Sequence, residues 1–217
     1  MSDGPSCVAA RHERRRAVSA AIDVAIIDSG GANLASLQFA LERLGARSLV
    51  SSDAGAIAQA PRVLLPGVGA AGDAMRRLRS AGLDQLIPTL QAPLLGICLG
   101  MQLLFEHSAE GDTACLAILD GRVERLTPYP GLSVPHMGWN TLATIADDPL
   151  LAGIDADSYL YFVHSFAAPV AGSTLAAVHY GRPLAAVVRR DNFYGVQFHP
   201  ERSATVGAHI LRNFLAL

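Results

Sequence analysis

Residues 93–106 read PLLGICLGMQLLFE, and this stretch decides the fold. A short apolar run ends in the pentapeptide GICLG, where Cys98 lies between Gly96 and Gly100, and apolar residues at helical spacing follow at once. A strand that ends in Gly-x-nucleophile-x-Gly and passes straight into a helix is the nucleophile-elbow pattern. The two glycines allow a strained turn, which predicts that Cys98 is held above the end of a strand. Taken alone, the stretch also fits a buried, inert cysteine.

Short apolar runs alternate with amphipathic segments on the N-terminal side of this stretch, as parallel strands joined by crossover helices require. Beyond residue 111 further strands follow without long helices between them, which predicts an added antiparallel portion. The whole pattern predicts an α/β fold with a doubly wound, mostly parallel sheet. The predicted strands are 22–28, 48–50, 63–65, 94–98, 159–166, 175–180, 184–190 and 193–198, and the predicted helices are 34–44, 71–79, 83–90 and 204–215.

The composition excludes several classes of protein. With 217 residues, 51% of them hydrophobic, the chain fits one well-buried domain, which we expect over residues 22–217, while residues 1–21 are expected to be a disordered extension. A net charge of -2 gives no field for holding nucleic acid. The apolar stretch 92–105 is shorter than the roughly 20 residues that span a bilayer. Three cysteines are too few for a disulfide framework and fit a reducing cytoplasm.

The second motif is FHPE, residues 198–201, which follows a predicted strand. Residues two apart in an extended segment project to the same side, so His199 and Glu201 are expected to lie together. Glu201 would then fix the tautomer of His199, and His199 would exchange a proton with Cys98. A surface His-Pro-Glu turn is the alternative.

The third motif is LPGVG, residues 65–69, at the end of another predicted strand. Ligand sites lie off the carboxyl ends of parallel strands, so this turn is expected near Cys98. Backbone amides of this turn could form one half of an oxyanion hole, opposite the amide of Leu99. A plain strand-to-helix turn and a phosphate cradle stay open as alternatives, although neither GxGxxG nor a Walker lysine is present. No cofactor and no metal site is predicted.

With Cys98, His199 and Glu201 in that order, the chain resembles the class I glutamine amidotransferases, whose fold is flavodoxin-like. Five stretches resemble the glutaminase subunits of imidazole glycerol phosphate synthase. They are LLPGVGAAGDAM (64–75), LLGICLGMQLLFE (94–106), VPHMGWN (134–140), YFVHSF (161–166) and GVQFHPERS (195–203).

The resemblance implies that L-glutamine is hydrolysed to glutamate and ammonia through a glutamyl thioester on Cys98. It also implies that amides near Gly69 and Leu99 hold the oxyanion, and that Gln102 and the backbone near Ser165 hold the glutamine. Ammonia would pass to a (β/α)8-barrel cyclase subunit in a heterodimer, which makes imidazole glycerol phosphate and an aminoimidazole carboxamide ribotide for histidine biosynthesis.

The resemblance further implies a partner-facing surface with Asn33, Trp139 and Arg202. Met137 and Trp139 are large apolar residues in a turn-rich stretch, which suits interface anchors, although Trp139 as a core residue is nearly as good an interpretation. The chain departs from the family pattern at four positions. Ser29 replaces a tyrosine, Ala32 and Cys115 replace glycines, and Arg202 replaces a lysine, which keeps the charge but not the geometry.

Three other functions stay open from the sequence. The chain could be another amidotransferase of the class, such as the glutaminase of pyridoxal phosphate synthase, which shares FHPE but not PHMGWN. It could be a cysteine peptidase or γ-glutamyl hydrolase with the same triad. A catalytically silent binding subunit is the third, and the intact triad argues against it.

Overall fold

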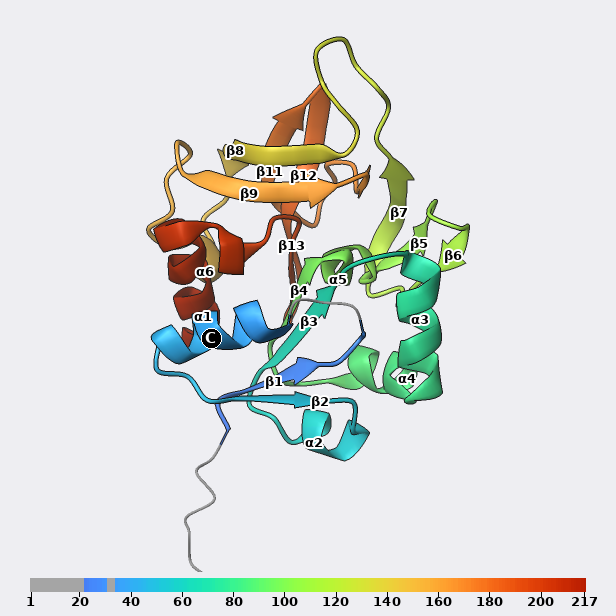
Figure 1. Cartoon of the computed structure of the whole chain (residues 1–217), viewed down its shortest axis with the longest axis vertical. Coiled ribbons are helices and arrows are strands. Elements are labelled where there is room, and N and C mark those ends of the chain that lie inside the picture. The colour runs from blue at the N-terminus through green and yellow to red at the C-terminus, as the bar shows by residue number, and fades with distance from the viewer. Residues whose placement is uncertain (1–21, 31–33) are drawn as a thin grey trace, which may run out of the picture.

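The computed structural model describes residues 22–30 and 34–217. Its main feature is a sheet in which nine described strands follow the order β2-β1-β3-β4-β13-β12-β11-β8-β9 (Figure 1). This α/β architecture confirms the predicted fold class. The strands are β1 (Val24–Ile27), β2 (Ser48–Ser51), β3 (Val63–Gly67), β4 (Leu94–Cys98), β8 (His136–Ile145), β9 (Tyr159–His164), β11 (Thr174–Tyr180), β12 (Arg182–Arg190) and β13 (Phe193–Val196).

The first half of the sheet is parallel and positions the candidate nucleophile. Strand β4 pairs in parallel with β3 on one side and with β13 on the other. The register sets Gly67 opposite Cys98, so the LPGVG turn and the elbow leave the same edge of the sheet. Residues of β1 and β3 are fully buried because helices cover both faces, as a parallel sheet requires.

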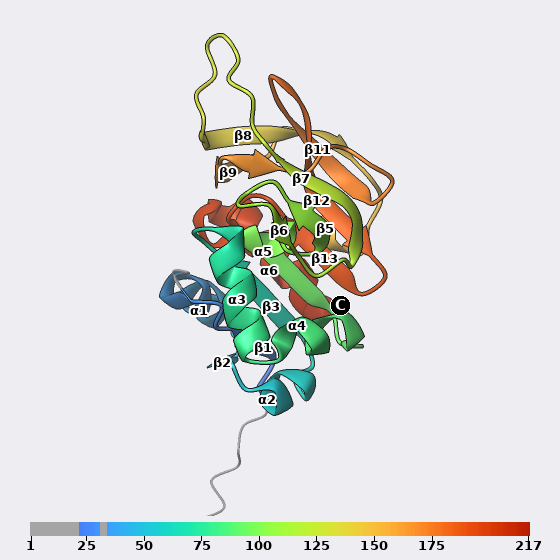
Figure 2. The same ribbon diagram turned by 90° about the vertical axis from the view of Figure 1, so that its right-hand side faces the viewer.

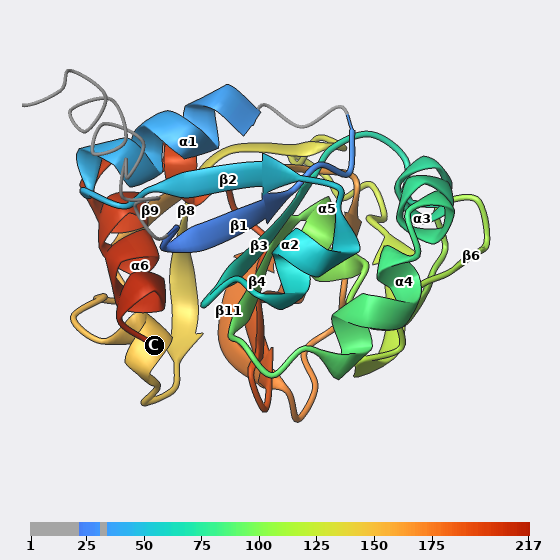
Figure 3. The same ribbon diagram turned by 90° about the horizontal axis from the view of Figure 1, so that it is seen from below.

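Two layers of helices enclose this parallel half (Figure 3). On one face, α1 and α6 bury Leu41 and Phe214 against the sheet. On the other face, α2, α3 and α4 bury Ile57 and Met75. The described helices are α1 (Leu34–Arg43), α2 (Ala54–Ala58), α3 (Ala71–Ser80), α4 (Leu83–Leu86), α5 (Leu99–Gln102) and α6 (Ala204–Ala216).

The second half of the sheet is antiparallel, as predicted. Strands β12, β11, β8 and β9 pair in turn with their neighbours in antiparallel fashion. A separate four-stranded sheet lies beside α3 and the elbow (Figure 2). It has the order β10 (Phe166–Ala167), β7 (Leu119–Arg125), β5 (Phe105–Ser108) and β6 (Thr113–Ala114).

Most predicted elements are present, and several differ in detail. The strand 94–98 has the predicted bounds, whereas the predicted helix 83–90 divides into α4 and a 3-10 turn, Ile87–Thr89, because Pro88 interrupts the helical hydrogen bonds. Helix α2 and the small sheet were not predicted. In the stretch PHMGWN, expected to be rich in turns, all residues after Pro135 belong to β8. None of the helices in residues 22–30 and 34–217 has the length and apolar character needed to cross a bilayer.

Candidate active site

The elbow predicted around Cys98 is present. Strand β4 ends at Cys98, whose φ of 54° and ψ of -109° turn the chain sharply before α5 begins at Leu99. Gly100 makes this turn possible, because a Cβ there would lie 1.7 Å from the carbonyl oxygen of Leu65. The strained backbone of Cys98 is therefore held by the packing of α5 against β3.

We expect Gly100→Ala to destabilise the fold by about 3 kcal/mol or more. The added methyl group meets backbone atoms of β3, which cannot move aside as a flexible side chain would. Chemical denaturation of both proteins measures the loss. Gly172→Ala is the matched control, since a Cβ at Gly172 meets nothing within 4 Å and its expected effect is under about 0.5 kcal/mol. Equal stability of the two variants would contradict the close approach at the elbow.

His199 and Glu201 are brought together as predicted. His199 has extended backbone angles and is followed by a 3-10 turn, Pro200–Arg202, that carries Glu201 back toward it. The imidazole Nδ1 lies 2.8 Å from Glu201 Oε1, and since a carboxylate accepts, Nδ1 is the donor. The His199 backbone is fixed at both ends: its N–H donates to Tyr161 and its carbonyl accepts from the Ser203 hydroxyl.

The other imidazole nitrogen of His199 is free for chemistry. His199 Nε2 is buried and has no partner of hydrogen-bonding geometry within the described part of the chain. Burial lowers the pKa of His199, but the neighbouring Cys98 and Glu201 outweigh burial and raise the pKa to about 10. A protonated imidazole beside Cys98 and Glu201 is thus the favoured form of His199.

This raised pKa predicts a pH dependence of stability. A pKa of about 10 in the folded state exceeds the ordinary 6.5, so the contribution of His199 is complete below pH 6.5 and is lost as pH rises through about 10. We expect the difference in unfolding free energy between the wild type and His199→Gln to shrink over this range. Urea denaturation at several pH values measures it, and a constant difference would contradict a charged His199.

The triad opens into a cavity of about 420 Å³. Every residue predicted for oxyanion stabilisation and glutamine binding lines this cavity: Gly69, Leu99, Gln102 and Ser165. Gly69 has a φ of 84°, a left-handed conformation that glycine adopts without strain. The cavity therefore joins the LPGVG turn, the elbow and the segment after β9, all at the edge predicted from the sequence.

Gln102 is fixed inside the cavity wall. Its amide nitrogen donates to the Phe166 carbonyl oxygen at 2.8 Å and to Gln197 Oε1 at 3.0 Å. Gln197 in turn lies with its amide nitrogen 3.8 Å from the Cys98 sulfur and is fully buried. The sequence analysis missed Gln197, although its place directly before FHPE in a predicted strand was a usable signal.

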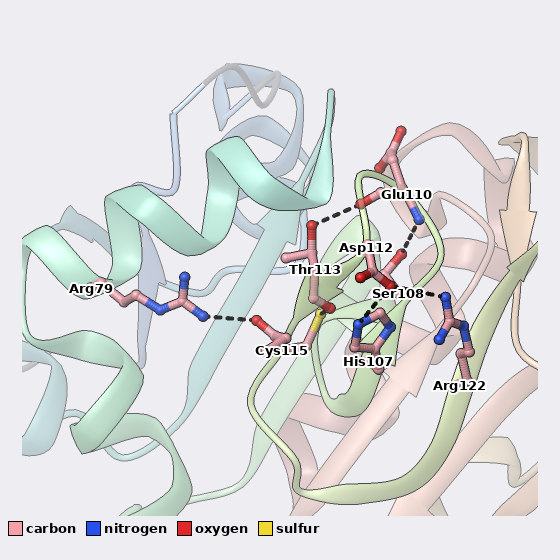
Figure 4. A network of polar contacts seen from close by, with 9 residues as sticks. Arg79, His107, Ser108, Glu110, Asp112, Thr113, Cys115 and Arg122 are labelled. Atoms are coloured by element: carbon pink, nitrogen blue, oxygen red, sulfur yellow. Dashed lines mark hydrogen bonds and ion pairs between the residues drawn. The ribbon is translucent and has the colours of Figure 1, made fainter.

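Glu110 is a second residue that the sequence analysis missed. It lines the cavity, and its carboxylate accepts from the Ala71 N–H at the start of α3, just after the LPGVG turn. Figure 4 shows how the turn between β5 and β6 holds it: the Glu110 N–H donates to the Ser108 hydroxyl, and the Thr113 hydroxyl donates to the Glu110 carbonyl. Only the unpredicted β5–β6 pairing places this carboxylate at the cavity.

The residues expected at a partner surface lie in different parts of the structure. Met137 and Trp139 project from β8 with 60% and 52% of their surface exposed, so the interpretation of Trp139 as core is wrong. Arg202 lines the cavity and places its guanidinium 4.6 Å from the Tyr161 ring centroid. Asn33 lies outside the described residues, as do Ala32 and residues 1–21.

Ser29 has a structural role that was not expected. It is fully buried, and its hydroxyl donates to the Pro66 carbonyl at 2.7 Å, at the start of the glycine turn. Arg77 on α3 donates to the Ser29 carbonyl. The serine that replaces tyrosine at this position therefore helps to hold the turn beside Cys98.

A cysteine on an elbow, backed by a histidine and a glutamate, defines a thiol-dependent hydrolase or acyl transferase. The family model described as "Glutamine amidotransferase class-I" matches residues 25–217. Solved structures share the fold: a glutamine amidotransferase superposes with a TM-score of 0.70 at 20% identity over 89% of this chain and 97% of that one. PurLQS from Thermotoga maritima superposes with a TM-score of 0.66 at 17% identity over 89% and 97%.

Similar sequences give a narrower result. The imidazole glycerol phosphate synthase subunit HisH of Xanthomonas euvesicatoria pv. vesicatoria (strain 85-10) is 56% identical over 90% of this chain and 98% of that protein. HisH of Xylella fastidiosa (strain 9a5c) is 54% identical over the same shares. The chain therefore belongs to the class I glutamine amidotransferases, and within them to the family of HisH subunits of imidazole glycerol phosphate synthase.

Proposed function

We propose that the chain hydrolyses L-glutamine to glutamate and ammonia with Cys98 as the nucleophile. The observation that carries this proposal is the convergence of Cys98, His199 and Glu201 on one cavity in a chain of this family. The Cys98 thiolate attacks the carboxamide carbon, and His199 gives its proton to the departing ammonia. Water, deprotonated by His199, then cleaves the glutamyl thioester and restores the thiol.

The oxyanion of both tetrahedral intermediates is stabilised by backbone amides. Leu99, the first residue of α5, follows the nucleophile directly, and Gly69 faces the same cavity from the neighbouring strand. Amides placed this way stabilise charge that develops in the transition state, because they need no reorganisation. A Cβ at Gly69 would meet nothing within 4 Å, and its φ is left-handed, so we propose that the Gly69 peptide reorients when the partner binds.

Three groups at the cavity hold the substrate. Both N–H bonds of the Gln102 amide are engaged by protein carbonyls, which leaves its own carbonyl oxygen to accept from the substrate. Glu110 supplies a carboxylate suited to an α-ammonium group, and backbone near Ser165 contacts the amino-acid end. This set matches the two charges and the carboxamide of free glutamine better than it matches a peptide chain.

The chain is proposed to act in a heterodimer with a (β/α)8-barrel cyclase subunit, which uses the ammonia to make imidazole glycerol phosphate and an aminoimidazole carboxamide ribotide. Support comes from the relatives, which are named as synthase subunits, and from an exposed apolar group on β8 and β9. Met137, Trp139 and Tyr159 are 60%, 52% and 61% exposed. Large apolar side chains exposed together mark protein interfaces. Asn33 and Arg202 are proposed to extend this surface, and the complex is proposed to be cytoplasmic and free of cofactors.

Ammonia release from glutamine tests this function. It is measured for the purified chain alone, with a barrel cyclase, and with the cyclase and its ribonucleotide ligand. We expect weak activity alone and strong stimulation with cyclase and ligand together. Full activity without the cyclase would contradict activation by the partner, and release of glutamate only from γ-glutamyl peptides would favour a γ-glutamyl hydrolase.

A further inference from the structure

Two buried histidines outside the triad form a hydrogen-bonded series, and one of them, His164, lines the active-site cavity. His136 on β8 and His164 on β9 are 3% and 6% exposed, and His136 Nδ1 lies 3.0 Å from His164 Nε2. His136 is stacked between Phe162 and Tyr180, with ring centroids 4.8 Å and 3.9 Å away. The reaction proposed above uses neither histidine, so their burial in hydrogen-bonding contact needs another explanation.

The groups at the two ends of this hydrogen-bonded series determine which nitrogen of each imidazole carries the proton. The Phe166 carbonyl can only accept, so His164 Nδ1, 2.9 Å away, carries a proton. At the other end the Asn140 amide nitrogen donates to the His179 carbonyl and to His136 Nε2, at 3.1 Å and 3.3 Å, so His136 Nε2 accepts. The Asn140 amide orientation is set because its oxygen accepts from the Thr141 N–H.

Both imidazoles are thus neutral and protonated on Nδ1. His136 donates from Nδ1 to His164 Nε2, and His164 donates from Nδ1 to Phe166. Burial lowers the pKa of His136 to about 4. Burial, together with the neighbouring His136, lowers the pKa of His164 to about 3. The three hydrogen bonds therefore point the same way, each with its donor on the Asn140 side and its acceptor on the Phe166 side.

The hydrogen-bonded series ends at the wall of the active-site cavity. The Phe166 carbonyl that accepts from His164 also accepts from Gln102 at 2.8 Å, and Gln102 donates its second N–H to Gln197. We propose that His136 and His164 are positioning residues that fix the Phe166 carbonyl and hence the Gln102 amide for binding glutamine. This inference rests on the function proposed above, because it assigns Gln102 to the substrate.

His136 acts through the tautomer of His164. Without the Nδ1–H of His136, His164 can move its proton to Nε2, and a lone pair on Nδ1 then faces the lone pairs of Phe166. The carbonyl and Gln102 would shift together. Loss of one such hydrogen bond corresponds to about tenfold in binding.

Two substitutions separate hydrogen bonding from packing. His136→Phe keeps a ring between Phe162 and Tyr180 but removes the donor, and we expect it to raise KM for glutamine about tenfold with kcat changed less than about threefold. His136→Asn loses the ring but places an N–H near the position of Nδ1, and we expect it to recover most of the affinity despite lower stability. His179→Phe is the matched control, because His179 lies on the neighbouring strand β11 and its side chain is exposed.

The rates are measured with the cyclase and its ribonucleotide ligand present, and the proton positions by nitrogen NMR of the full chain with ¹⁵N-labelled histidine at pH 7. Two neutral imidazoles protonated on Nδ1 are expected, one of them lost in His136→Phe. A cationic or Nε2-protonated His136 or His164 would overturn the proposal, as would an unchanged KM in His136→Phe. If the wild type hydrolyses no glutamine, the proposed function fails instead, and the NMR spectrum still decides the tautomers.

Discussion

Cys98→Ala is expected to abolish glutamine hydrolysis, with a loss on the order of 10⁴-fold or more, because Cys98 is the only thiol among the described residues that line the cavity. Alanine keeps the Cβ, so the backbone strain at a φ of 54° is the same for both residues. The fold and the binding of the cyclase are therefore expected to persist. Ammonia release and a pull-down of the cyclase measure the two properties on the same sample.

Cys115→Ala is the matched control for this loss. Cys115 lies on the β5–β6 side of the small sheet, and burial raises the pKa of its thiol to about 11, so it stays protonated and unreactive at neutral pH. We expect unchanged activity in this variant. Residual hydrolysis in Cys98→Ala that disappears only when Cys115 is also replaced would contradict the assignment of the nucleophile.

His199→Ala is expected to lower kcat on the order of 10³-fold or more while the chain stays folded. His199 both takes the proton of Cys98 and returns it to ammonia, and the substitution removes both transfers. The substitution also removes the protonated imidazole beside Cys98. Stopped-flow or endpoint ammonia assays at saturating glutamine measure kcat directly.

The stability of the same variant separates catalysis from structure. Glu201→Gln is the comparison, because glutamine still accepts from His199 Nδ1 but no longer carries the charge that stabilises the imidazolium. We expect an intermediate loss of kcat for Glu201→Gln. Both variants are expected to stay folded, with melting temperatures below that of the wild type because the pair of charged His199 and Glu201 is lost. A loss of folding in His199→Ala as complete as its loss of activity would mean that His199 is structural.

The parts of the site that depend on local pattern could be predicted from the sequence. The glycine spacing around Cys98 fixes the elbow, and the parallel register that sets Gly67 beside Cys98 follows from two neighbouring strands. The His199–Glu201 pair was predicted from a two-residue spacing, although the structure achieves it with a 3-10 turn instead of a continued strand. These features need little information from the rest of the chain.

The parts that depend on distant pairing could not be predicted in this way. Glu110 reaches the cavity only because β5 and β6 form a short hairpin, and a two-residue strand such as β6 leaves no period in the sequence. Strand β8 was obscured by Pro135 and Gly138, which are typical of turns. Its alternation was nonetheless present: Met137 and Trp139 are exposed, while His136, directly before Met137, is buried.

The most direct test of the central claim is acid quenching of the chain during glutamine turnover, followed by peptide mass spectrometry. The account predicts a glutamyl adduct on the peptide that contains Cys98, at higher occupancy when the cyclase and its ribonucleotide ligand are present, and none on the peptide that contains Cys115. Turnover of glutamine without an adduct on Cys98, or with an adduct on another residue, would contradict it.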